Sequence, residues 1–314
     1  MLRYAAKRIL ALIPILIGVS LLVFIMMQLT PGDPAVIILG PRASQETLQA
    51  FREQMGLNLP IWQQYLRWIG NILQGDFGIS YHFKRPVTDL MLERLGPTIL
   101  LTITSMILAT VFGLIAGVIS ATKQYSLSDR VMMTLALIGF CLPVFWLGLI
   151  LQFFFSIRLG WLPAAGINAP GQTGWVDTAL HLILPSIALS VGAMATIARM
   201  TRSSMLEVVR QDYIKTAKAK GVSEQNISYR HALRNALIPV VTVVGSQFGY
   251  LLSGQILLEK VFNWPGLGML MIDSILKRDV PLIQGTVLVV AFMYVLVNLV
   301  VDLLYGLLDP RIKY

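Results

Sequence analysis

The chain has 314 residues, of which 56% are hydrophobic and 13% are charged, about half the charged share of a soluble domain. A soluble fold of this size could not bury so much apolar surface, which favours an integral membrane protein. The single cysteine, Cys141, excludes an internal disulfide framework and a cysteine-rich metal site. The net charge of +9 would indicate a nucleic-acid partner only if the basic residues shared one water-facing surface, and they do not.

Six apolar stretches are each long enough for a helix to cross a hydrocarbon core of roughly 30 Å. They are residues 9–29, 98–121, 131–157, 182–198, 237–258 and 283–305. All must be helical, because lipid cannot satisfy the backbone groups of an open strand. The sequence therefore predicts an all-α polytopic protein with six transmembrane helices. The first stretch is longer than the core of a signal peptide, and no small-residue cleavage site follows it, which favours an uncleaved helix.

The distribution of basic residues gives these helices a direction. With the N-terminus inside, the inner segments hold 15 Lys or Arg and five acidic residues in about 64 positions. The outer segments hold 10 of each in about 116 positions. Cytoplasmic loops of membrane proteins are enriched in Lys and Arg, so we expect both termini to be cytoplasmic. The inner segments are 1–8, 122–130, 199–236 and 306–314, and the outer ones are 30–97, 158–181 and 259–282.

The outer segment 30–97 separates the first helix (1–29) from a core with the other five spans (98–314), and we interpret it as an extracytoplasmic cap. Its prolines at the start must end the first helix, because proline cannot continue the hydrogen-bond ladder. The pattern predicts helices over 45–55 and 60–74. One side of the second helix carries Trp62, Tyr65, Trp68 and Ile69. The cap is either a surface for a substrate-delivering partner or a lid with its tryptophans at the membrane interface, and we slightly favour the lid for the tryptophans.

The inner segment 199–236 is hydrophilic and basic, and its pattern predicts a helix from Thr201 that Gly221 ends. A second short helix is expected from Glu224 to Asn235, before the fifth apolar stretch. A helix–Gly–helix element with small residues could dock closely into a groove of another protein. The positive-inside rule explains its charge equally well. The helix that begins at Thr201 is expected to carry one stripe along its surface, formed by Leu206, Val209, Tyr213 and Ala217.

Two stretches of this segment, Asp212–Gly221 and His231–Pro239, resemble the cytoplasmic coupling loop of bacterial ABC importer permeases. They most resemble the dipeptide, oligopeptide, glutathione and nickel permease family. Further motifs agree in chain order: Pro31–Pro34, Gln74–Gly78, Arg199–Met205, Phe262–Gly268, Asp302–Tyr305 and Asp309–Arg311. Within the family, Leu101–Met106 and Glu259–Trp264 look most like a dipeptide or glutathione permease.

One departure narrows the resemblance. The general importer loop begins with Glu-Ala-Ala, whereas this chain has Lys215-Thr-Ala217 there, and its first following proline is Pro239. This variant is the usual one in the peptide and nickel branch. Because this variant has no glutamate at the start of the loop, no role is expected for one there.

The resemblance implies a type I ABC importer permease fold in the bacterial inner membrane. It implies ATP-driven import of di- or oligopeptides or glutathione, with a nickel or metal-chelate permease as the alternative within the family. The expected partners are a second permease subunit in a heterodimer, two ATP-binding subunits, an extracytoplasmic substrate-binding protein and membrane lipid. The residues expected to contact the ATPase are Tyr213, Thr216, Ala217, Ala219, Gly221, His231, Arg234 and Asn235.

The chain has no phosphate-binding loop, so we expect ATP and Mg²⁺ to bind partner subunits. No catalytic residue, cofactor or metal is expected on this chain. A self-contained secondary transporter is the alternative from another class, but it would usually show an internal repeat and intramembrane charges, and neither is evident. A membrane protease is disfavoured, because Ser246 and Ser253 share the fifth stretch with no histidine at matching depth.

Overall fold

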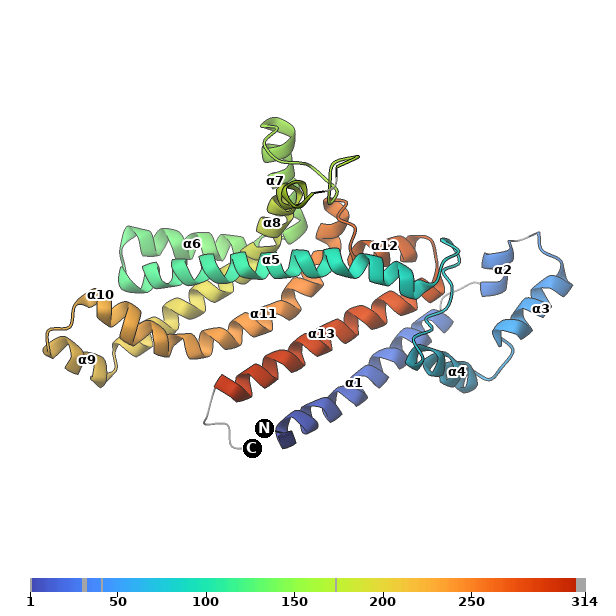
Figure 1. Cartoon of the computed structure of the whole chain (residues 1–314), viewed down its shortest axis with the longest axis horizontal. Helices are drawn as coiled ribbons and strands as arrows, with labels where there is room; N and C mark the ends of the chain where they lie inside the picture. The colour runs from blue at the N-terminus through green and yellow to red at the C-terminus, as the bar shows by residue number, and fades with distance from the viewer. Residues whose placement is uncertain (1, 30–32, 41, 173, 309–314) are drawn as a thin grey trace. The chain divides into compact units, whose positions relative to one another are not determined.

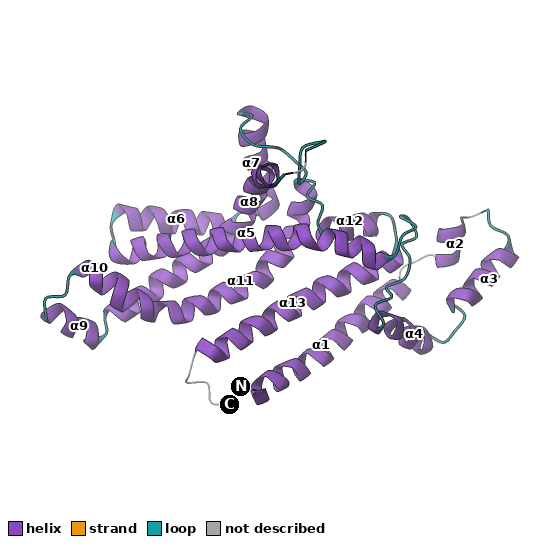
Figure 2. Ribbon diagram, in the orientation of Figure 1, coloured by secondary structure: helices purple, strands orange, loops and turns teal. Residues whose placement is uncertain are grey.

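The computed structural model describes residues 2–29, 33–40, 42–172 and 174–308. In these ranges the regular structure is helical, and the only strand-like pairing is an isolated bridge between Ile79 and Pro86 (Figures 1 and 2). The helices are α1 (Leu2–Leu29), α2 (Pro34–Leu39), α3 (Gln45–Met55), α4 (Ile61–Leu73), α5 (Val87–Thr122), α6 (Leu127–Cys141), α7 (Val144–Leu151), the π-helical η1 (Gln152–Arg158), α8 (Trp175–Val209), α9 (Asp212–Ala219), α10 (Glu224–Asn226), the π-helical η2 (Ile227–Ala232), α11 (Leu233–Val261), α12 (Leu267–Leu276) and α13 (Val280–Leu308).

Five helices in the described ranges are long and apolar enough to cross a membrane, and the bent pair of α6 with α7 and η1 makes up to six. The prediction of an all-helical membrane fold is therefore confirmed. The expected span over 131–157 corresponds to this pair, but it is not one continuous helix, because the pair is bent by 107°. Leu142 is extended at the bend (ψ 131°), as the ring of Pro143 requires of the residue before it.

The fourth apolar stretch, 182–198, is the middle of α8, which extends well beyond it at both ends. The apolar pattern underestimates the length of this helix because both of its ends are polar. α8 packs against α6, α7 and α11. It also approaches α5 closely, since a Cβ on Gly117 would lie 2.7 Å from the Ala198 carbonyl oxygen. Small residues permit such close contact between membrane helices, and α8 is the central helix of this bundle.

The chain divides into two compact units, each described here by itself. The first contains residues 96–269 with parts of the terminal helices. One end of its core is closed by a group that we call the Glu259 clasp, formed by Thr98, Glu259, Trp264 and Leu267. Glu259 is fully buried and accepts from the Thr98 hydroxyl at 2.8 Å. The Leu267 N–H donates to the same hydroxyl at 2.8 Å, and the Trp264 indole N–H donates to a carbonyl of α5 at 3.0 Å.

The second unit contains residues 6–95 and 270–293. The helices predicted over 45–55 and 60–74 are confirmed as α3 and α4. The aromatic side of α4 is divided: Tyr65 and Trp68 pack on Phe24 of α1 at ring distances of 5.5 and 5.7 Å, whereas Trp62 is 62% exposed. Two of the aromatic residues thus hold the cap helix to α1, and Trp62 alone faces outward.

Candidate functional site

The connection between α8 and α11 contains the residues that the sequence singles out. α8 ends at Val209, Gln211 is extended (φ −68°, ψ 150°), and α9 begins at Asp212. The predicted continuous helix from Thr201 is therefore wrong. Gly221 does follow the end of α9, with φ at +78°, and its N–H donates to the carbonyl of Lys218 at 2.9 Å. Glycine adopts this left-handed conformation without steric cost, which makes it the usual helix terminator.

The second half of the connection is not a separate short helix. Ser223 caps α10, and α10, η2 and α11 then follow one another without a break to Val261. Pro239, expected at the start of the fifth span, lies inside α11. Membrane helices tolerate such a proline when local adjustments satisfy the freed backbone groups. The connection is thus joined to α8 through an extended residue and to α11 through continuous helix.

One buried residue fixes α9 against its neighbours. Ile214 is fully buried, as is Ile227 of η2, and α9 packs against η2. The Asn235 amide also donates to the Tyr213 hydroxyl at 2.7 Å. The predicted stripe through Leu206 and Tyr213 is wrong, because the break at Gln211 reorients α9 and turns Ile214 inward.

The base of the connection rests on a small apolar cluster. Val118 of α5, Met205 of α8, Ala232 of η2 and Ala236 of α11 are all buried there together. The cluster joins α5, α8 and the continuous helix of η2 and α11, and α9 contacts both α8 and η2. A displacement of α9 therefore acts on packed helices and not on a free loop.

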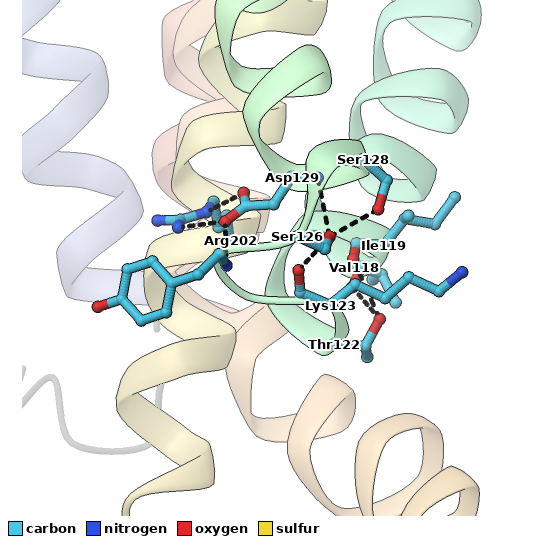
Figure 3. Close-up of polar contacts among 9 residues, drawn as sticks. Val118, Ile119, Thr122, Lys123, Ser126, Ser128, Asp129 and Arg202 are labelled. Atoms are coloured by element: carbon cyan, nitrogen blue, oxygen red, sulfur yellow. Dashed lines mark hydrogen bonds and ion pairs between the residues drawn. The ribbon is translucent and has the colours of Figure 1, made fainter.

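A buried ion pair stabilises the same end of the bundle. Asp129 of α6 is 3% exposed and accepts two hydrogen bonds from Arg202 of α8, at 2.7 and 2.8 Å (Figure 3). The Tyr125 N–H donates to the same carboxylate at 3.0 Å. Sequence reasoning counted both residues as inner-loop charges and placed Arg202 in the motif Arg199–Met205, but it did not pair them. Their distance along the chain leaves no local signal of the pairing.

The remaining predicted contact residues form an accessible surface. Thr216, Ala219, Gly221 and Arg234 are exposed, whereas Ala217 and His231 are half-buried. Tyr213 and Asn235 are exposed but hydrogen-bonded to each other.

The charges of the connection are partly neutralised. Lys215 pairs with Asp212 at 2.8 Å, and Lys218 pairs with Glu224 at 2.9 Å. Four exposed cations have no acidic partner within the part of the chain that the structure describes: Arg210, Lys220, Arg230 and Arg234. The exposed face combines small side chains with net positive charge. Such a face suits close docking against an acidic surface of a protein.

Comparison with protein families covers nearly the whole chain. Residues 109–314 match the family described as "Binding-protein-dependent transport system inner membrane component". Residues 1–102 match the family described as "Binding-prot-dependent transport system membrane comp, N-term".

Full-length relatives are similar along their entire length. The chain is 48% identical over 314 residues to the "Glutathione transport system permease protein GsiC" of Escherichia coli strain K12, with 100% of each chain covered. The protein of the same name from Shigella flexneri serotype 5b is also 48% identical with full coverage of both.

Two solved structures share the fold. The MetNI methionine ABC transporter in an inward-facing conformation has a TM-score of 0.58 at 18% identity, covering 70% of this chain and 96% of that one. An amino acid ABC transporter with histidines has a TM-score of 0.52 at 18% identity, covering 72% and 95%. These similarities extend to the architecture of the bundle.

Proposed function

Because the chain belongs to the family of inner-membrane components of binding-protein-dependent transport systems, we propose that it is the permease subunit of an ATP-driven importer of short peptides, with glutathione as the first substrate to test. The observation that carries the substrate is the 48% identity, over the full length of both chains, to permeases named for glutathione transport. The ABC importer permease fold of the solved neighbours supports the transport class.

The proposed complex contains a second permease subunit in a heterodimer, two ATP-binding subunits that hold ATP and Mg²⁺, and an extracytoplasmic binding protein. ATP hydrolysis would belong to the ATP-binding subunits. The family description, which names a binding-protein-dependent system, supports the extracytoplasmic partner.

Residues 212–235 are proposed to contact an ATP-binding subunit. Ala219 and Gly221 allow close backbone approach, and Arg230 and Arg234 supply charge for an acidic groove. Closure of the two ATP-binding subunits would push α9, and the packing of Ile214 would pass that push to η2 and α11. The exposure of the small residues beside unpaired cations supports this role.

Co-expression with the partner subunits tests the proposal. A tag on this chain should capture the ATP-binding subunits, and the purified complex should show ATPase activity that the loaded binding protein stimulates. Proteoliposomes should then accumulate labelled glutathione only when ATP and the binding protein are present. Transport by this chain alone, or an intact stimulated complex that does not import glutathione, would contradict the proposal.

We propose in addition that both termini lie in the cytoplasm. The excess of Lys and Arg in the inner segments supports this orientation. A fluorescent protein fused after residue 308 should fold and fluoresce, whereas alkaline phosphatase fused after residue 170 should be active. The opposite pair of results would reverse the topology.

A further inference from the structure

The second unit contains a cavity of about 550 Å³ to which the proposed function gives no role. It is bordered by the C-terminal end of α1, by α4, by the turn at residues 76–78 and by the start of α13. Small-molecule sites in proteins range from roughly 300 to 1,000 Å³, so the cavity has room for a ligand of tripeptide size.

One wall of the cavity is aromatic. Phe24 and Trp68 line it, with their ring centroids 5.7 Å apart, and Tyr81 borders it from the loop before α5. Burial, and next the nearby Asp279 carboxylate, raise the pKa of Tyr81 to about 12, so its hydroxyl remains a neutral donor at physiological pH. Flat, rigid side chains of this kind suit contact with the apolar parts of a ligand.

The rest of the lining includes side-chain amides, two of which are held in place by hydrogen bonds. Gln28 donates to the Gln64 side-chain oxygen at 3.0 Å, and the Gln64 amide donates to the Leu57 carbonyl at 3.0 Å. Asn71 lies on the same helix as Gln64 and also lines the cavity. Side-chain amides both donate and accept, which matches the peptide groups of a ligand.

The charged residues of the cavity differ in their partners. Arg52 is committed to Asp33 in an ion pair. Arg67 has no acidic partner within the described ranges, and its guanidinium lies over Gly56, where a Cβ would come within 2.8 Å of Nη1. Asp76, which accepts from the Gly78 N–H at 2.8 Å, supplies a carboxylate to the same cavity. The site therefore offers a cation and an anion together.

We propose that this cavity binds a short peptide in its zwitterionic form, with the peptide's carboxylate on Arg67 and its ammonium group toward Asp76. Guanidinium groups pair with carboxylates through two parallel hydrogen bonds, which gives Arg67 the most specific role. An acyl chain is a poorer occupant, because amides and charges interrupt the apolar lining. The inference rests on the proposed import of peptides and adds a binding step on the cap of this subunit.

Cysteine protection tests the inference in the assembled importer, without the binding protein. The native Cys141 is first replaced by serine, and Asn71→Cys is introduced as the reporter, with Leu73→Cys as the matched control. Leu73 lies on the same helix, is 83% exposed and does not line the cavity. Trialanine should slow maleimide labelling of Asn71→Cys and leave Leu73→Cys unchanged, and C-terminally amidated trialanine should protect less.

A charge variant identifies the recognising group. Arg67→Ala should raise the trialanine concentration needed for half-protection roughly tenfold, the effect of losing a charged hydrogen bond. Arg42→Ala, which removes an exposed cation elsewhere on the cap, should leave it unchanged. Equal labelling with and without trialanine, or protection unaffected by Arg67→Ala, would overturn the inference.

Two further outcomes separate this inference from other possibilities. If protection follows zwitterionic phospholipid added to the detergent, and not trialanine, the cavity holds a lipid headgroup and the proposal is wrong. Uptake is measured on the same preparation with the binding protein present. Uptake without protection would contradict only the cavity site, whereas protection without uptake of any peptide would contradict only the proposed function.

Discussion

Gly221 has φ at +78°, and the space beside its Cα is open. A side chain there costs about 1–2 kcal/mol of backbone strain and stands on the proposed docking face. Gly221→Val should therefore reduce ATP-dependent uptake strongly while the protein still reaches the membrane. Gly171→Val is the matched control, since Gly171 has φ at +79° and equally open space but lies in another loop. Equal loss of uptake in both variants would attribute the effect to strain alone.

Asp129 and Arg202 form a pair in which the carboxylate is almost fully buried. Removing Arg202 leaves the buried Asp129 carboxylate unpaired, so Arg202→Ala should destabilise the unit by about 2–3 kcal/mol. Thermal unfolding of the purified complex measures the loss. Asp212→Ala, which breaks the exposed pair with Lys215, should have almost no effect. If Arg202→Ala and the double variant with Asp129→Ala are both as stable as the native protein, the pair is not structural.

The roles of residues whose partners lie far away along the chain could not be predicted from the sequence. Gly221 was predictable, because a glycine after a helical pattern signals a left-handed end. Asp129 and Arg202 were not, since their pairing depends on how α6 packs against α8 and leaves no periodic trace. The accessible residues Thr216, Ala219 and Arg234 came from family resemblance, and their contact with an ATP-binding subunit stays a prediction.

Among contacts between elements, the Glu259 clasp joins Thr98 of α5, the end of α11 and the start of α12 through one hydroxyl. Thr98→Val removes the donor to Glu259 and the acceptor of the Leu267 N–H together. Leaving these buried groups without that partner should cost about 2–3 kcal/mol. Thr122→Val on the same helix removes only local bonds to the Val118 and Ile119 carbonyls and serves as the control. Melting temperatures that match between the two variants would contradict the assignment.

The ion pair between Asp33, which caps α2, and Arg52 of α3 should respond to pH. The hydrogen bond from Arg52 holds the pKa of Asp33 below its ordinary value, so the folded cap favours the ionised form. The contribution of this ion pair to the stability of the cap is complete above the ordinary carboxyl pKa of about 4. It is lost as the pH falls through the lowered pKa of Asp33. Hydrogen exchange in 42–55, corrected for intrinsic rates, should rise in this acidic range. Asp33→Asn should show faster exchange already at pH 7 and no such rise, and an unchanged profile would sink the idea.

Element types were more predictable than element ends. The spans and the cap helices over 45–55 and 60–74 follow from apolar length and start signals, and they are confirmed. The sharp bend at Pro143 and the continuity from Glu224 to Val261 were missed. Membrane helices tolerate proline and π-helical turns, so a proline alone does not reveal whether a helix bends or continues.

For the whole molecule, full-length similarity establishes the family and the fold, and composition alone establishes the membrane class. The direction of the termini stays a prediction from charge. The substrate is proposed from named relatives, because no side chain in the sequence encodes it by pattern. The cavity of the second unit depends on contacts between α1, α4 and α13, which no local pattern reports.

The uninterrupted helix from Glu224 to Val261 is roughly 55 Å long at 1.5 Å per residue, well beyond the roughly 30 Å hydrocarbon core. One end carries His231 and Arg234, and the other carries Glu259 in its clasp. We expect this helix to move together with α8, because the two helices pack against each other. A push at the proposed docking face would then reach the Glu259 clasp at the other end, so we expect the two ends of the bundle to respond together.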